Sequence, residues 1–159
     1  MRRTLALILA ATALGTAGLA ADRKSWNKIR YVGGTIPVKT SPYDWNTTLT
    51  ITMQPPSIVL SIAPGTLFSP KQTVRIASSS VTSLSAGPGA WRRVAGIGGA
   101  LLPAKPPPLF GLLQDNGFLG ITWQTDDGKS AGVVLESRLV WQILPALKSV
   151  TGKGVEDSP

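Results

Sequence analysis

Short segments of alternating apolar and polar residues, separated by turns rich in proline and glycine, constrain the fold of this chain more than any other feature. The clearest is 45–54, in which alternate residues from Trp45 to Met53 fall on one side. Alternation with a period of two is typical of a strand with one buried face. The same reasoning predicts further strands over 28–36, 57–62, 72–77, 80–86, 117–125 and 129–136.

Two of these segments carry finer signals. In 28–36, Ile29 and Tyr31 fall on one face and Arg30 and Val32 on the other, and the glycine pair 33–34 predicts a bulge or bend. Residues 126–128 read Asp-Asp-Gly, a tight-turn signature between two strand segments, so 117–136 is predicted to be a hairpin.

The last element is predicted to be an amphipathic helix. Ser137 is placed to cap it, and apolar residues from Leu139 to Leu147 recur at helical spacing. Pro145 should kink or shorten the helix, Gly152 should stop it, and residues 153–159 are predicted to be a polar tail. Strands in series followed by one helix predict a mainly β fold with antiparallel pairing, closed by a C-terminal helix.

Composition limits the chemistry. The chain has 159 residues, 43% of them hydrophobic and 15% charged, which suits one folded domain. It contains no Cys and no His, which excludes disulfides, thiolate chemistry, Cys/His metal sites and every catalytic mechanism that needs a histidine base. The sequence therefore predicts no cofactor and no metal.

The N-terminus predicts export. Arg2 and Arg3 precede an uncharged run that ends in small residues, which is typical of a secretory signal peptide over residues 1–21. The alternative is an uncleaved anchor, because the run is just long enough to cross a bilayer. We expect a single domain over 22–153, a tail over 154–159, and a location in the periplasm, cell envelope or extracellular space.

The formal net charge is +8, yet the basic residues are scattered. A nucleic-acid site would need a dense basic stripe or basic residues interleaved with stacking aromatics, so no nucleic-acid partner is predicted.

The predicted order of elements resembles the pleckstrin-homology-like (PH-like) fold, a two-sheet antiparallel, partly open barrel of about seven strands with a C-terminal capping helix. More specifically, the chain resembles a group of uncharacterised exported bacterial proteins with a PH-like (GRAM-like) domain, over residues 26–153. The segments that carry the resemblance are Tyr31–Ile36, Trp45–Thr50, Val81–Gly87, Arg92–Arg93, Leu119–Trp123 and Val150–Lys153. The resemblance implies a fold and no activity.

The segment 90–113 is an apolar insertion between strands. Its first half is too short to span a membrane, and its prolines forbid a continuous helix. One prediction is that it covers the sheet or mediates self-association. The alternative is that it inserts into a lipid interface with its aromatic and basic residues at the headgroups. The residues expected at such a partner or membrane contact are Trp91, Arg92, Arg93, Leu101, Leu102, Leu109 and Phe110.

Catalytic readings are weak. Ser25 and Lys28 match a serine-lysine motif, with Lys39 in a second motif, but that chemistry needs the serine at a helix start. Asp126 and Asp127 lie in an exposed turn, where neither pKa is expected to shift. No catalytic residue is predicted.

The leading prediction is a non-enzymatic exported binding or scaffolding module with a protein partner or a second copy of itself. The alternative is peripheral binding to anionic lipid through 90–113, and a small hydrolase is the third reading. Sugar binding would need exposed aromatic rings; Trp26 and Trp91 are the tryptophans expected to be partly exposed, with Trp45, Trp123 and Trp141 expected in the core.

Overall fold

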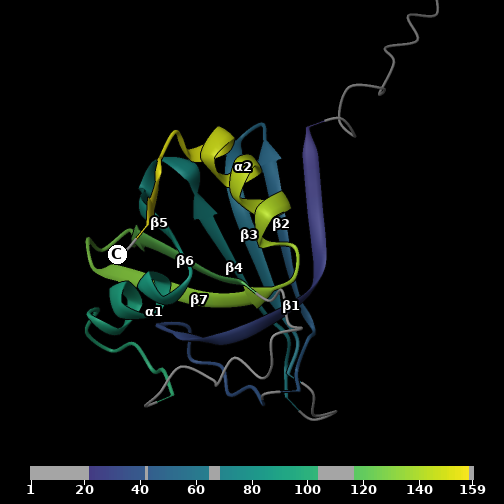
Figure 1. Ribbon diagram of the computed structural model, residues 1–159, viewed down its shortest axis with the longest axis vertical. Helices are drawn as coiled ribbons and strands as arrows, with labels where there is room; N and C mark the ends of the chain where they lie inside the picture. The colour runs from purple at the N-terminus through teal and green to yellow at the C-terminus, as the bar shows by residue number, and fades with distance from the viewer. Residues whose placement is uncertain (1–21, 42, 65–68, 104–116, 158–159) are drawn as a thin grey trace, which may run out of the picture.

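Strands dominate the computed structural model, which describes residues 22–41, 43–64, 69–103 and 117–157 (Figure 1). Two α-helices and one short 3-10 helix, η1, accompany the strands. In chain order the elements are β1 (Arg23–Gly34), β2 (Thr47–Met53), β3 (Pro56–Ile62), β4 (Gln72–Ala77), η1 (Ser78–Ser80), β5 (Val81–Ala86), α1 (Pro88–Ala95), β6 (Gly117–Gln124), β7 (Ser130–Ser137), α2 (Val140–Thr151) and β8 (Val155–Asp157).

One open sheet contains all eight of these strands, in the order β4-β3-β2-β1-β7-β6-β5-β8. Every pairing is antiparallel except that of β5 with β8. The mainly β fold, the antiparallel pairing and the C-terminal helix predicted from the sequence are confirmed. The hairpin of β6 and β7 is confirmed as well, with eight residue pairs in unbroken register.

Strand β1 joins the two halves of the sheet. It pairs with β2 through Arg23–Ile29 and with β7 through Arg30–Gly34. The register shifts between Trp26 and Ile29, where Lys28 has a φ of 57°, and it shifts again before Gly33, as the glycine pair predicts. These irregularities let one strand change partner along its length.

The main core lies between the two halves of the sheet and is closed by α2. The faces of β1 are as predicted, because Ile29 and Tyr31 enter this core whereas Val32 points to the opposite side. The prediction that Ser137 caps the helix is wrong, because α2 begins only at Val140 with Leu139 as its N-cap residue. The Ser137 hydroxyl instead accepts a hydrogen bond from the backbone N–H of Leu139 at 3.0 Å. Pro145 is accommodated within the helix, and Gly152 ends it with a φ of 68°.

A second, smaller core lies on the outer side of β6 and β7, under α1. Figure 1 shows α1 and α2 on opposite sides of this strand pair. The buried residues of this second core are Val32, Ala90, Trp91, Val94, Phe118 and Val134. Trp91 and Phe118 meet edge to face with their ring centroids 6.4 Å apart, a favourable aromatic geometry.

Three tryptophan predictions are wrong. Trp45 was expected in the core, but it is only partly buried and lies over the Arg30 guanidinium, outside both cores. Trp91 was expected to be partly exposed, but it is 8% exposed because α1 turns it onto Phe118. Trp141 was expected in the core, but it is 77% exposed because the buried stripe of α2 runs through Val140, Ile143 and Leu144 instead.

The strand boundaries also differ from the prediction. Strand β1 begins at Arg23, five residues before the predicted start at Lys28, because β2 is long enough to pair with the additional residues. Where a polar tail was predicted, Val155–Asp157 form an eighth strand parallel to β5.

Candidate binding surface around α1 and residues 97–103

The predicted contact residues separate into exposed and buried groups. Arg92 and Arg93 lie on the exposed side of α1, whereas Trp91 points into the second core. Leu101 is exposed and Leu102 packs against the second core. Leu109 and Phe110 lie outside the described residues. The structure thus places Arg92, Arg93 and Leu101 at the surface of this region.

The sequence explains where α1 begins. Gly87 takes a φ of 66° and Pro88 occupies the first helical turn, where its missing N–H costs nothing. The apolar side of this short helix then covers the outer face of β6 and β7. The basic pair that follows Trp91 is left facing solvent.

An ion pair connects α1 to the C-terminal strand. The Arg93 guanidinium contacts the carboxylate of Glu156, and each side chain is about half exposed, at 48% and 47%. Exposed pairs of this kind add little stability. The Arg93 charge is therefore already paired within the chain, whereas Arg92 makes no ion pair among the described residues.

Backbone hydrogen bonds hold the main chain of Leu101 in place, but its side chain is exposed to solvent. Its N–H donates to the carbonyl of Gly34 at 2.9 Å, and its carbonyl accepts from the N–H of Gly34 at 3.0 Å. A Cβ on Gly33 would overlap the Leu101 carbonyl oxygen, so glycine is needed for this close approach. The Leu101 side chain is nevertheless 77% exposed.

A shallow cleft of about 300 Å³ lies elsewhere, between the loop after β1 and the loop before β4. It is lined by Pro37, Val38, Lys39, Pro64, Ser69, Pro70 and Gln72. Lys39 is the only ionisable side chain in this lining, so these residues provide no acid-base pair.

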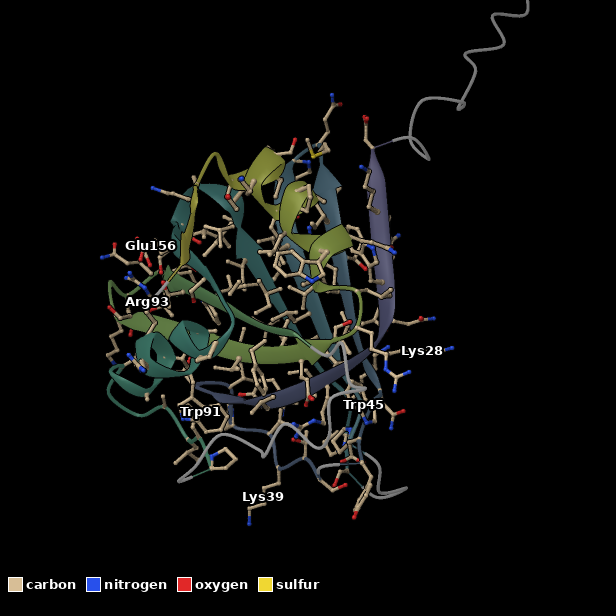
Figure 2. All side chains as sticks on the ribbon, viewed as in Figure 1. Lys28, Lys39, Trp45, Trp91, Arg93 and Glu156 are labelled. Carbon is tan, nitrogen blue, oxygen red and sulfur yellow. The ribbon has the colours of Figure 1, made fainter. Side chains whose placement is uncertain are left out.

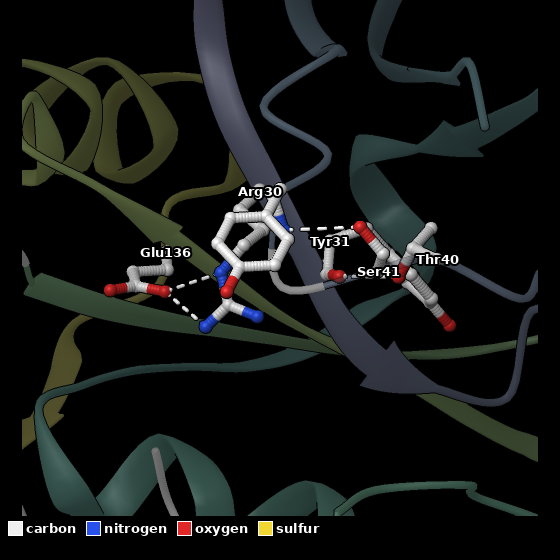
Figure 3. Close-up of polar contacts among 6 residues, drawn as sticks. Arg30, Tyr31, Thr40, Ser41 and Glu136 are labelled. Atoms are coloured by element: carbon white, nitrogen blue, oxygen red, sulfur yellow. Dashed lines mark hydrogen bonds and ion pairs between the residues drawn. The ribbon is translucent and has the colours of Figure 1, made fainter. Parts of the chain in front are cut away.

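A buried ion pair joins β1 to β7 (Figure 3). The Nε of Arg30 donates to Oε2 of Glu136 at 2.6 Å, and Nη2 donates to the same oxygen. The guanidinium carbon of Arg30 also lies 5.9 Å from the centroid of the Trp45 ring. Because both side chains are buried and bonded to each other, the pair stabilises the pairing of β1 with β7 rather than offering a charge to a ligand.

Tyr31 is also committed to the fold. Its hydroxyl donates to the Ile36 carbonyl at 3.0 Å, and burial raises the pKa of this phenol far above its usual value. The Thr40 hydroxyl donates to the Tyr31 carbonyl at 2.9 Å, which draws the loop after β1 back onto that strand (Figure 3).

The serine-lysine motif does not have the geometry that its chemistry needs. Ser25 and Lys28 both lie in β1 rather than at a helix start, and the Ser25 hydroxyl is hydrogen-bonded to that of Thr50 at 3.0 Å.

The prediction for the Asp-Asp turn is wrong in one respect. A hydrogen bond from the Thr125 side chain, helped by Lys129, lowers the pKa of Asp127, although its carboxylate is fully exposed. The Thr125 hydroxyl donates to the Asp127 carboxylate and to the Lys129 carbonyl, so it stabilises the turn that the Asp-Asp-Gly motif predicts. Within the described ranges, no cluster of three or more acidic, Cys or His side chains is arranged to hold a metal ion.

In the part of the chain that the structure describes, no helix is both long enough and apolar enough to cross a membrane. Comparison with known proteins returned no matching family model, no matching curated protein and no matching solved structure.

Sequence reasoning missed two surface features. The exposed Trp141 is one, and the N-terminal extension of β1, which carries Arg23 and Lys24, is the other. A usable signal for Trp141 was present, because it lies outside the stripe formed by Ile143, Leu144 and Leu147.

Proposed function

We propose that this chain is an exported, non-enzymatic, PH-like module that binds a protein partner in the cell envelope. The strand order β4-β3-β2-β1-β7-β6-β5, with a C-terminal helix closing the core, supports the PH-like assignment. The basic and apolar N-terminal sequence over residues 1–21 supports export. Fold by itself assigns no ligand, so the function rests on the surface.

The observation that carries the proposal is the Leu101 side chain. It is 77% exposed, while two backbone hydrogen bonds to Gly34 hold its main chain in place. A large apolar side chain presented on a fixed backbone loses little conformational entropy when a partner covers it. Arg92, on neighbouring α1, adds an exposed cation that would suit the polar rim of such an interface.

The test compares three forms of the full chain: the unaltered protein, Leu101→Ser, and Tyr43→Ser as a control that removes a different exposed hydrophobic side chain. Each is crosslinked in the producing cell, and its partners are quantified by mass spectrometry. We expect Leu101→Ser to lose a specific partner that Tyr43→Ser retains. Equal partner recovery by all three forms would reject this surface.

Anionic lipid is the second candidate, and the exposed Arg92 is what favours it. Flotation with anionic and neutral vesicles at low and moderate salt separates the two proposals. Lipid binding should require anionic vesicles, weaken with salt and vanish in Arg92→Ala/Arg93→Ala. Protein binding should survive that change. Because Trp91 is buried and Arg93 contacts Glu156, fewer of the residues expected at a membrane contact are free to reach lipid headgroups.

A further inference from the structure

We propose that the N-terminal half of β1, Arg23–Lys28, accepts an acidic, extended peptide segment as an added strand. This inference names a partner class for the binding module proposed above and rests on that proposal for its biological setting. It uses a surface separate from Leu101, so the two are tested independently.

The first observation is an open strand edge. Arg23–Ile29 pair with β2, and β7 takes over only from Arg30 onward. Among the described residues, therefore, the side of Arg23–Lys28 that faces away from β2 has no strand neighbour. Alternate residues of such a strand direct their N–H and C=O groups toward the open side, where another extended chain can pair with them.

The second observation is the charge along this edge. Arg23, Lys24 and Lys28 are all exposed. Asp22 directly precedes this strand half, but Arg23–Lys28 contains no acidic residue, and the twelve residues of α2 contain none either. Figure 2 shows Lys28 extending outward from the side of the molecule, well away from Lys39. An edge with this charge attracts a strand that carries carboxylates and repels one that carries cations.

The third observation concerns α2. Strand β1 changes partner from β2 to β7 at Arg30, which is opposite Glu136 near the end of β7. Helix α2 begins four residues after Glu136, so its start lies close to this point in the chain. The first turn of α2 carries Trp141, which is 77% exposed. Figure 1 shows the chain passing from β7 beside β1 into α2. An exposed indole in this region offers apolar contact area to a partner strand.

Charge also argues against a second copy of the chain as the occupant. Two β1 edges paired antiparallel about the peptide bond between residues 25 and 26 would place Arg23 of one copy opposite Lys28 of the other, and pairing about Trp26 would place Lys24 opposite Lys28. Like charges that face each other across a strand pair are destabilising. The bulge at Lys28 further limits the open edge to a few residues, which suits a short peptide.

The experiment uses the full chain and three synthetic octapeptides as probes. One alternates Glu and Val. The second alternates Glu and Pro, and so has the same charge but lacks half of the backbone N–H groups. The third alternates Lys and Val. Binding is measured by fluorescence anisotropy, and the site is located by NMR shifts and amide hydrogen exchange.

We expect the Glu–Val peptide to bind and to protect amides of Arg23–Lys28 from exchange. The Glu–Pro peptide should bind weaker by about tenfold or more, because each proline holds φ at about −65°, away from the value of about −140° in an antiparallel strand, and also lacks an N–H donor. Lys24→Glu/Lys28→Glu should weaken Glu–Val binding by about tenfold or more. The matched double charge reversal Lys39→Glu/Lys71→Glu, in the exposed loops after β1 and before β4, should leave it unchanged.

Three results would overturn the proposal: no Glu–Val binding at peptide concentrations up to about 1 mM, equal binding of the Glu–Val and Glu–Pro peptides, or protection that maps outside β1. Equal binding of these two would indicate general attraction of polyanions. The Leu101→Ser variant should bind the Glu–Val peptide normally. The loss of a crosslinked partner in that variant and the loss of peptide binding here are thus separate outcomes.

Discussion

Removing the carboxylate charge of Glu136 should destabilise this protein more than any surface substitution. Arg30 and Glu136 are only 7% and 8% exposed, and they face each other across the β1–β7 pairing. In Glu136→Gln the side chain keeps its shape, but the Arg30 guanidinium remains buried without its counter-charge. Breaking a buried pair from one side costs about 3–5 kcal/mol.

That cost is large against the stability of a typical domain, about 5–15 kcal/mol. The assay is urea denaturation followed by tryptophan fluorescence and by circular dichroism, whose transitions should coincide. With a denaturant slope of about 2 kcal/mol per molar, the midpoint should fall by about 2 M. An unchanged slope would show that the lower midpoint reflects lost stability rather than a change in the compactness of the denatured state.

A double-mutant cycle tests the cause. Arg30→Met also removes the cation contact with Trp45, which contributes about 0.5–1 kcal/mol. The pair Arg30→Met/Glu136→Leu leaves no buried charge, so it should cost less than either single change. The control is Arg93→Met, which breaks the half-exposed pair with Glu156 and should cost less than about 1 kcal/mol.

Two outcomes would refute this reasoning. One is a loss in Glu136→Gln below about 1 kcal/mol, equal to that of the exposed control. The other is a double variant whose loss equals the sum of the two single losses, because independent effects would mean that the two charges do not depend on each other.

Three further predictions concern single positions. Ser85→Ala should stabilise the protein by about 1 kcal/mol in urea denaturation, since among the described residues its buried hydroxyl has no hydrogen-bond partner; a loss instead would reveal one. Gly34→Ala should lower stability by about 3 kcal/mol, because its φ is 148° and a Cβ would overlap the Gly132 carbonyl oxygen. The control Gly128→Ala, where φ is 80° and the space is open, should lower stability by about 1 kcal/mol. Equal losses in the two variants would contradict the overlap. Burial raises the pKa of Tyr31 above the ordinary tyrosine value of 10.0, so the unfolded chain ionises first and stability should fall as the pH rises past that value. In Tyr31→Phe, urea midpoints measured against pH should decline less steeply, and an unchanged slope would contradict this.

Much of the local structure was predictable because it depends on neighbours in sequence. Alternation placed Ile29 and Tyr31 opposite Val32, and the Asp-Asp-Gly turn predicted the hairpin. Gly152 ended α2 as expected, since a left-handed residue after a helix favours glycine. Each of these outcomes follows from the spacing of side chains along a strand or helix, which the sequence states directly.

The candidate site was only partly predictable. The sequence identified 90–113 as an apolar insertion and named Arg92, Arg93 and Leu101 among its contact residues. It did not reveal that Trp91 would face Phe118 or that Arg93 would contact Glu156. Those outcomes depend on where α1 and β8 pack, and both elements pack on strands that are distant in sequence.

The sequence by itself therefore determined the kinds of most elements, though not of α1 or β8, as well as most of their faces and the absence of cysteine and histidine chemistry. Tertiary structure alone decided which faces are covered. It paired Arg30 with Glu136 across 106 positions and left Trp141 in solvent. Among the described strands, it also left the first half of β1 without a neighbour on one side. The physical reason is that a local pattern specifies which side of an element is apolar, whereas burial depends on which distant element arrives to cover that side.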